Sequence, residues 1–247
     1  MSDSDQNIPE VTPAQMAEVE RAMVRDYRIS LLQMMESAGR NLAQLARTRF
    51  LAGDARGRAI VVLAGAGGNG GGAMVCARRL HGWGARVQVI LAQPLQRLGQ
   101  AASHQLNILE RMGIPEVECG AFPRESTGIW AELVIDGIIG CGLKGAPRSP
   151  AADLIRWANE QSAPTIALDV PSGLDATTGT INDPAIRAAA TLTLALPKRG
   201  LRVSGTESHV GELYLGDIGI PPSLYASPAL GLQVGPIFGG EEIIRLK

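Results

Sequence analysis

From residue 58 onward, short apolar runs alternate with segments of helical periodicity, and this alternation strongly limits the folds open to the chain. The runs at 58–64, 86–91, 133–136 and 165–168 are continuous stretches of mainly Val, Ile, Leu and Ala. Such strands are buried on both faces, as in a parallel sheet covered by helices. Further strands are predicted at 190–195 and 212–215, and helices at 71–82, 98–112 and 151–161. The pattern predicts a three-layer, Rossmann-like α/β fold with a mostly parallel sheet and helices on both faces.

Two amphipathic helices are predicted ahead of the first strand. Thr12, with Pro13 after it and Gln15 three residues on, is a capping-box helix start, and Ser30 with Gln33 is a second. Residues 1–10 are polar and acidic, and we expect them to be disordered. No repeat or low-complexity linker divides the rest, so we expect the 247 residues to form a single domain.

Composition excludes several classes of function. The net charge is −1, which argues against a nucleic-acid or anionic-membrane partner. No apolar run approaches the roughly 18 residues that a membrane span needs, and the N-terminus does not resemble a secretion signal. The three cysteines, Cys76, Cys119 and Cys141, are widely separated, which favours a reducing, cytoplasmic location over a disulfide framework or a zinc site.

A glycine-rich loop follows the first strand. Residues 65–72 read GAGGNGGG, between a predicted strand and a predicted helix. Backbone N–H groups at a helix N-terminus form an anion cradle, so we expect this loop to bind a ligand. Gly65, Gly67 and Gly70 satisfy G-x-G-x-x-G, but the second strand leads into Ala92, Gln93 and Pro94 without the carboxylate that a dinucleotide-binding dehydrogenase uses. No lysine follows the glycines, so the loop is not a P-loop either.

Aspartates stand at the ends of two other predicted strands. Asp136 leads into a second glycine-rich loop, and Asp169 precedes the rigid turn Pro171-Ser172-Gly173. In an open parallel sheet, ligands bind beyond the carboxyl ends of the strands. Each aspartate alone is more typical of a turn-capping residue, but together with the glycine loop they predict one polar pocket.

Several segments together resemble the NAD(P)H-hydrate epimerase family, also called the YjeF N-terminal family. The resemblance covers roughly residues 12–222 and rests on these motifs: 34–40 (MMESAGR), 136–142 (DGIIGCG), 169–175 (DVPSGLD), 198–201 (KRGL) and 217–221 (DIGIP). It implies an enzyme that interconverts the R and S forms of hydrated NADH or NADPH, a nucleotide-like substrate, for metabolite repair.

The resemblance also implies a set of site residues. Asn69, Asp136 and Ser172 match the family's potassium ligands, and oxygen ligands of this kind suit a hard monovalent cation. The matching substrate contacts are Gly68, Asn69, Gly70, Gly71 and Gly72 in the first loop, Gly140, Cys141, Gly142, Leu143, Lys144, Gly145 and Ala146 in the second, and Asp169. A group that gives and takes a proton near neutral pH is required, and Asp169 is our candidate with Lys144 as a second.

The resemblance implies two kinds of partner. A separate dehydratase would complete the repair, and family members are often homodimers. The apolar faces of the helices at 12–26 and 30–50 are candidate dimer contacts.

The first loop departs from the family pattern. The usual G-x-G-N-N-G-G-D-G has Gly68 in place of the first Asn, Gly72 in place of Asp, and Ala73 in place of the last Gly. Each lost charge-assisted hydrogen bond is worth about 1.5–3 kcal/mol. Two alternatives to an active epimerase therefore stay open: a divergent member that binds another nucleotide-like or small polar ligand, and a non-catalytic interaction module.

Overall fold

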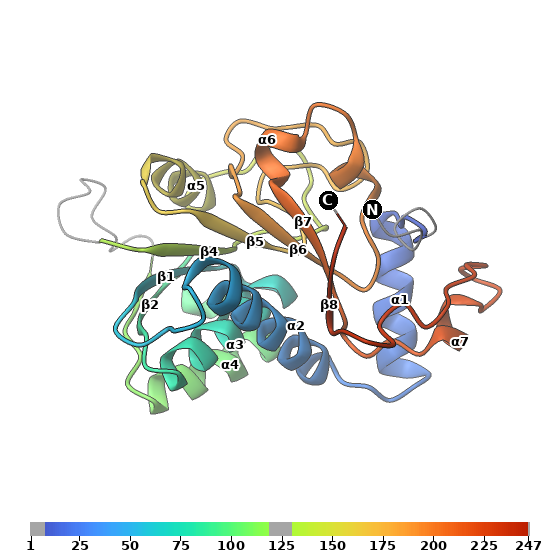
Figure 1. The fold of residues 1–247 in the computed structure, drawn as a ribbon, viewed down its shortest axis with the longest axis horizontal. Helices are drawn as coiled ribbons and strands as arrows, with labels where there is room; N and C mark the ends of the chain where they lie inside the picture. Colours follow the sequence, from blue (N-terminus) through green and yellow to red (C-terminus); the bar gives the residue numbers. More distant parts are fainter. Residues whose placement is uncertain (1–7, 119–129, 247) are drawn as a thin grey trace.

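The structure, a computed structural model, describes residues 8–118 and 130–246 and contains one eight-stranded sheet (Figure 1). The strand order is β3-β2-β1-β4-β5-β6-β7-β8. All neighbouring strands are parallel except the last pair, in which β8 runs antiparallel to β7. The chain leaves β1 toward β2 on one side and returns to β4 on the other, so the strand order reverses at the β1–β4 pair.

The helices are α1 (Pro13–Arg25), α2 (Leu31–Leu45, continued by a π-helical turn at Ala46–Phe50), α3 (Gly68–Gly82), α4 (Gln100–Arg111), α5 (Ala151–Glu160), α6 (Glu207–Val210) and α7 (Pro222–Tyr225), with 3₁₀ turns at Leu95–Arg97 and Arg199–Arg202. The strands are β1 (Ala59–Ala64), β2 (Arg86–Leu91), β3 (Glu116–Glu118), β4 (Leu133–Gly137), β5 (Thr165–Leu168), β6 (Ala190–Leu194), β7 (Glu212–Gly216) and β8 (Ile243–Arg245).

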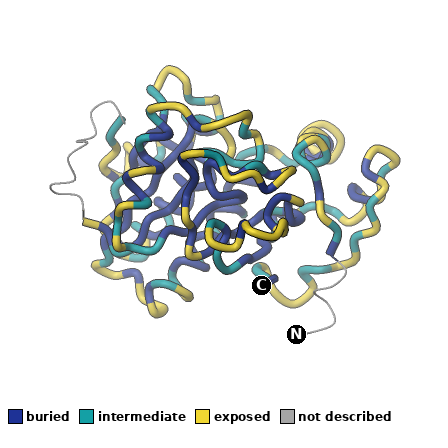
Figure 2. The backbone as a smooth tube through the Cα atoms, turned by 90° about the horizontal axis from the view of Figure 1, so that it is seen from above, coloured by how far each residue is buried: buried dark blue, intermediate teal, exposed yellow. Residues whose placement is uncertain are grey.

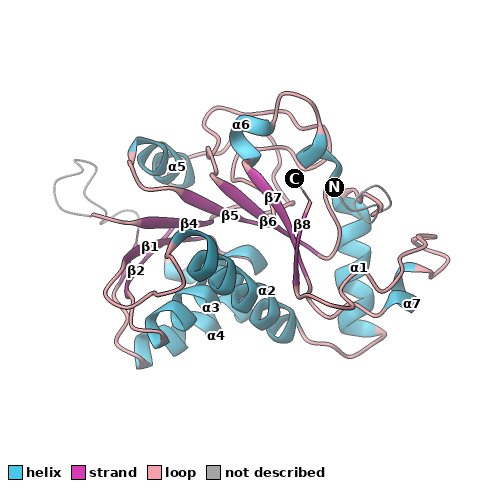
Figure 3. Cartoon of the chain, in the orientation of Figure 1, coloured by secondary structure: helices cyan, strands magenta, loops and turns pink. Residues whose placement is uncertain are grey.

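Helices cover both faces of the sheet, which confirms the predicted fold class (Figure 3). Alternate residues of β1 separate the two cores: Ile60 and Val62 pack with α2, α3 and α4, whereas Val61 and Leu63 pack with α5. Apolar burial on both faces is the main stabilising term, and it explains why these strands read as continuous apolar runs. In Figure 2 the buried segments accordingly run through the middle of the molecule.

Two strands were not predicted from the sequence. β3 has three residues, of which two are glutamates, and β8 lies in a segment rich in Pro and Gly. Both form the edges of the sheet. Short or charged edge strands resist pairing with other chains and carry little apolar signal.

Both N-terminal helices begin with the predicted capping boxes. The Thr12 hydroxyl accepts from the Gln15 N–H, and the Gln15 side chain accepts from the Thr12 N–H at 2.9 Å. Ser30 and Gln33 form the same arrangement, in which the Gln33 side chain accepts from the Ser30 N–H at 2.8 Å. Most of the segment expected to be disordered, residues 1–7, lies outside the described residues, but Ile8 is buried.

Among the residues that the structure describes, no helix is both long and apolar enough to cross a bilayer.

Candidate functional site

The loops after β1, β4, β5 and β6 meet at the carboxyl edge of the sheet, next to the reversal in strand order. Crevices at such reversals are the usual ligand sites of open α/β sheets. Here a cavity of about 350 Å³ lies between these loops and helices α1 and α2. Its volume is at the lower end of the range for small-molecule sites.

Most of the cavity wall is apolar, and polar groups enter it at a few points. The apolar wall comes mainly from the two N-terminal helices: Met16, Val19, Leu31, Met34, Met35 and Ala38. The sheet edge adds Gly68, Asn69, Gly140, Cys141, Gly142, Leu168, Asp169, Leu194 and Lys198. The cavity therefore suits a largely apolar ring that carries a few polar substituents.

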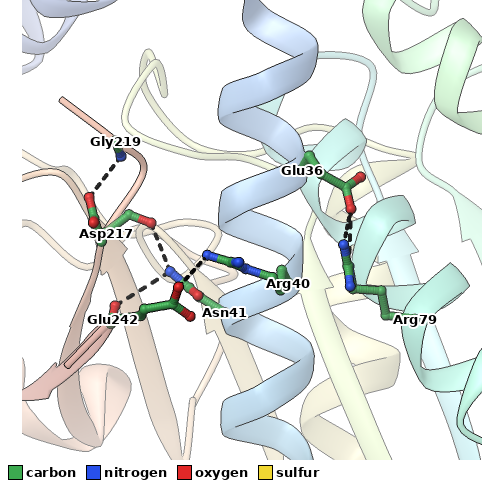
Figure 4. A network of polar contacts seen from close by, with 7 residues as sticks. All are labelled: Glu36, Arg40, Asn41, Arg79, Asp217, Gly219 and Glu242. Atoms are coloured by element: carbon green, nitrogen blue, oxygen red, sulfur yellow. Dashed lines mark hydrogen bonds and ion pairs between the residues drawn. The ribbon is translucent and has the colours of Figure 1, made fainter.

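Polar contacts on both sides of α2 hold this wall in place (Figure 4). Glu36 forms ion pairs with Arg78 and Arg79 of α3. On the other side, the Asn41 side chain donates to the Asp217 carbonyl at 2.7 Å, and Arg40 pairs with Glu242 at 2.7 Å. The helix is thereby fixed between α3 and the C-terminal segment, with its apolar face toward the cavity.

Helix α3 begins at Gly68, three residues before the predicted start, so most of the glycine loop forms its first turns. The N-cap residue Gly67 has no capping side chain, which leaves the first N–H groups of the helix without that partner. These groups and the helix dipole favour an anionic ligand at this end of the helix.

Close packing accounts for four of the loop glycines. A Cβ atom on Gly65 would lie 1.9 Å from the Ile138 carbonyl oxygen, and one on Gly70 would lie 1.9 Å from that of Gly65. On Gly71 it would lie 2.5 Å from Met35 Cε, and on Gly72 2.9 Å from Leu168 Cδ2. Gly67 and Gly68 have free space instead, so packing alone does not require glycine at those two positions.

Asp136 and Ser172 form a fully buried polar cluster. Asp136 Oδ1 accepts from Ser172 Oγ at 2.6 Å and from the Ile138 N–H at 3.1 Å, and Oδ2 accepts from the Ser172 N–H at 2.8 Å. Burial raises the pKa of Asp136 to about 6, and the hydrogen bonds from Ser172 and Ile138 only partly oppose this. None of its described hydrogen-bond partners is a cationic side chain.

Asn69 lies beside this cluster. Its side chain contacts Gly140, where an added Cβ would be 3.4 Å from the amide oxygen. The neighbouring Ile139 N–H donates to Ser172 Oγ at 2.8 Å. The amide nitrogen of Asn69 is buried and has no hydrogen-bond partner in the described part of the chain. The two amide atoms are interchangeable in assignment, so this position can hold either a donor or an oxygen ligand.

Asp169 is held in a left-handed conformation at the end of β5. Its φ is 66°, and the Val170 N–H donates to the Leu168 carbonyl at 2.8 Å, which closes a three-residue turn. Ala195 forms the same kind of turn at the end of the adjacent strand β6. Its φ is 67°, and the Leu196 N–H donates to the Leu194 carbonyl at 2.7 Å. Such a residue costs about 1–3 kcal/mol, and strain of this kind clusters at functional sites.

Lys198 forms a buried ion pair with Asp169. Its side chain is 0% exposed, and it also donates to the Leu194 carbonyl at 2.7 Å. The N-terminal segment covers Lys198 through a parallel backbone bridge at Val11. The Val11 N–H donates to the Pro197 carbonyl, and the Arg199 N–H donates to the Val11 carbonyl. Lys198 lies in a family motif, but the sequence alone predicts no role for it. The available signal was its position shortly after an apolar strand.

The structure brings some of the predicted site residues together at the cavity and places others away from it. The structure brings Gly68, Asn69, Gly140, Cys141, Gly142 and Asp169 to the cavity, and Asp136 and Ser172 lie directly behind it. Gly70, Gly71 and Gly72 are buried in the first turns of α3. Leu143, Lys144, Gly145 and Ala146 are not part of the cavity wall, and the Lys144 side chain is exposed. Asp169 therefore has Lys198, not Lys144, as its cationic neighbour.

Comparison with known proteins places the chain in a family. The family described as YjeF-related protein N-terminus matches residues 31–200. The chain belongs to this family. It is 42% identical to an NAD(P)H-hydrate epimerase from Dehalogenimonas lykanthroporepellens, over 98% of this chain and 94% of that protein.

Other relatives are longer or known by structure. A bifunctional NAD(P)H-hydrate repair enzyme from Salinibacter ruber is 37% identical over 87% of this chain, which spans 41% of that enzyme. The crystal structure of the yeast protein ynu0 superposes with a TM-score of 0.77 at 25% identity, and the match covers 97% of this chain and 100% of that one. The fold therefore extends over the chain as a whole.

Proposed function

We propose that this chain is an NAD(P)H-hydrate epimerase and that its reaction takes place in the cavity beside Asp169. The observation that carries the proposal is the 42% identity, over nearly the full length of both chains, to a protein of that name. The cavity supports it, because it offers an apolar wall for a reduced nicotinamide ring and, at the sheet edge, the Asp169 carboxylate, which can exchange a proton.

The position of the rest of the substrate is part of the proposal. A second cavity, of about 470 Å³, lies on the other side of the glycine loop and is lined by Gly67, Gly99, Gln100 and His104, among others. The uncapped start of α3 lies between the two cavities. A dinucleotide could thus place its hydrated ring beside Asp169 and its phosphates at the N–H groups of α3, with the second half in the far cavity.

The residues present fit a potassium ion at Asn69, Asp136 and Ser172. The supporting observations are a fully buried carboxylate whose described hydrogen bonds come from no cationic side chain, and the Asn69 side chain, which lies against Gly140 next to that cluster. A bound cation would supply the positive charge that a buried carboxylate needs. Carboxylate, hydroxyl and amide oxygens are the ligands that a hard monovalent cation prefers.

The chemistry assigned to Asp169 follows from the substrate. The inverted carbon carries a hydroxyl beside the ring nitrogen. When a proton reaches that hydroxyl, the C–O bond can break and water leaves, with the positive charge taken by the ring nitrogen. Water that adds to the opposite face returns the proton. One carboxyl acts as acid and then as base, so no further reactant is consumed.

The test is a direct assay. The purified R form of hydrated NADH is incubated with the protein in potassium buffer, and the S form is followed by chromatography. We expect conversion well above the spontaneous rate measured in buffer alone. A folded protein that gives no acceleration would overturn the assignment.

The proposal extends to partners and location. A dehydratase that acts on one epimer would use the product, and repair enzymes among the relatives are named bifunctional. Homodimer formation through α1 and α2 and a cytoplasmic location stay predictions from the sequence.

A further inference from the structure

We propose that Lys198 is the positioning residue of this site and that it shares one exchangeable proton with Asp169. The inference rests on the proposed function. Its basis is geometric: Lys198 is fully buried, pairs with Asp169, and is held at the carboxyl edge of the sheet beside the cavity. Asp169 is itself only 7% exposed.

The hydrogen bonds around Asp169 distinguish its two oxygens. Oδ1 accepts from Lys198 Nζ, from the Leu194 N–H at 3.2 Å and from the Thr193 hydroxyl at 3.5 Å. These three donors all approach the same atom. The two adjacent left-handed turns at Asp169 and Ala195 fix both the carboxylate and the carbonyl that holds Lys198.

Charge balance gives the pair its role. At rest, the ammonium and the carboxylate together carry no net charge. When a proton passes from Lys198 to the carboxylate, and from the carboxyl to the substrate hydroxyl, the C–O bond breaks and water leaves with the bonding electrons. The ring then carries one positive charge and the pair one negative charge. The buried site thus stays neutral throughout, which matters because an uncompensated charge is costly there.

The return step restores the pair. Water adds to the opposite face of the ring, its oxygen forms the new C–O bond, and its extra proton passes back through Asp169 to Lys198. Atoms and electrons balance without any other reactant. The other titratable groups among the described cavity residues are Cys141, whose thiol is hydrogen bonded to Asp169, and Glu20 on α1. Neither carries a positive charge that could replace Lys198.

The test compares the pH dependence of kcat for the wild type, Lys198→Met and Lys198→Gln, with spontaneous epimerisation subtracted. The wild type should change little between about pH 6 and pH 8, because the pair carries its own proton. In both variants Asp169 must take its proton from solvent. We expect kcat to be about 10²–10⁴-fold lower at neutral pH, to fall about tenfold per pH unit as pH rises, and KM to change little. Arg97→Met, an exposed cation outside both cavities, is the control.

The glutamine variant separates the two roles of Lys198. It keeps a hydrogen-bond donor for Asp169 and the Leu194 carbonyl but carries no charge. If Lys198 were merely structural, Lys198→Gln would restore the wild-type rate and pH profile, and that result would overturn the inference. If Lys198→Met does not fold, the double variant Asp169→Asn/Lys198→Met, without either charge, should fold and be inactive; activity in it would also overturn the inference. An inactive wild type would instead overturn the proposed function itself.

Discussion

Potassium should stabilise this protein above the pKa of Asp136 and lose that effect below it. Burial raises the pKa of Asp136 from 3.8 to about 6, a change that corresponds to about 3 kcal/mol. Because the native carboxyl holds its proton more tightly than the unfolded one, the free energy of unfolding should fall as pH rises from about 4 to about 6. A cation beside the ionised carboxylate offsets that loss. A proton on Asp136 competes with the cation.

Thermal unfolding measures this effect. At about pH 8, potassium at a hundred times its Kd should add about 2.7 kcal/mol, which corresponds to a rise in Tm of about 5–10 °C for a chain of this size. Tetramethylammonium at equal ionic strength is the control, because it is too large for the cluster. At about pH 5 the proton should weaken the apparent potassium affinity about tenfold, so the stabilisation should fall to about half, roughly 1.4 kcal/mol, and Ser172→Ala should reduce it at about pH 8. An equal potassium effect at both pH values, or none at pH 8, would refute the reasoning.

Three further predictions concern the loops around the cavity. Gly70→Ala should destabilise the fold by about 3 kcal/mol or more, since its Cβ would lie 1.9 Å from a backbone oxygen, whereas Gly67→Ala should leave the urea midpoint nearly unchanged; equal midpoints would contradict the packing account. Gly68→Asn should fold normally, because only Leu31 comes within 4.0 Å of the new Cβ, and should lower KM by up to about tenfold; an unchanged KM would show that the side chain does not reach the substrate. Burial raises the pKa of Cys141 to about 11, so its alkylation by iodoacetamide, followed by peptide mass spectrometry, should be slow at about pH 8, faster at higher pH, and slower still with ligand bound; rapid labelling at pH 8 would contradict this.

The sequence predicted the fold because its signals are local. Continuous apolar runs marked the buried strands, and β2 and β5 have the predicted bounds. The capping boxes at Thr12 and Ser30 depend on residues three positions apart, and both form. The edge strand β3 gave no such signal, because a buried apolar run is not required at the edge of a sheet.

The site was predictable only where strand ends determine it. Asp136 and Ser172 meet because β4 and β5 are neighbours, and parallel strands bring their carboxyl ends together. The role of the glycines was less accessible. Gly70 packs against Gly65 in the loop after β1, and Gly71 packs against Met35 of α2, and such contacts depend on how α3 approaches that loop and α2. Lys198 lies 29 residues after its partner Asp169, with no spacing rule to connect them.

A crystal structure of the protein with hydrated NADH and potassium would test the central claim most directly. We expect the hydrated ring in the cavity between α1, α2 and the sheet edge, with its hydroxyl within hydrogen-bond distance of Asp169, and the cation at Asn69, Asp136 and Ser172. A ring bound elsewhere, with this cavity empty, would contradict the account.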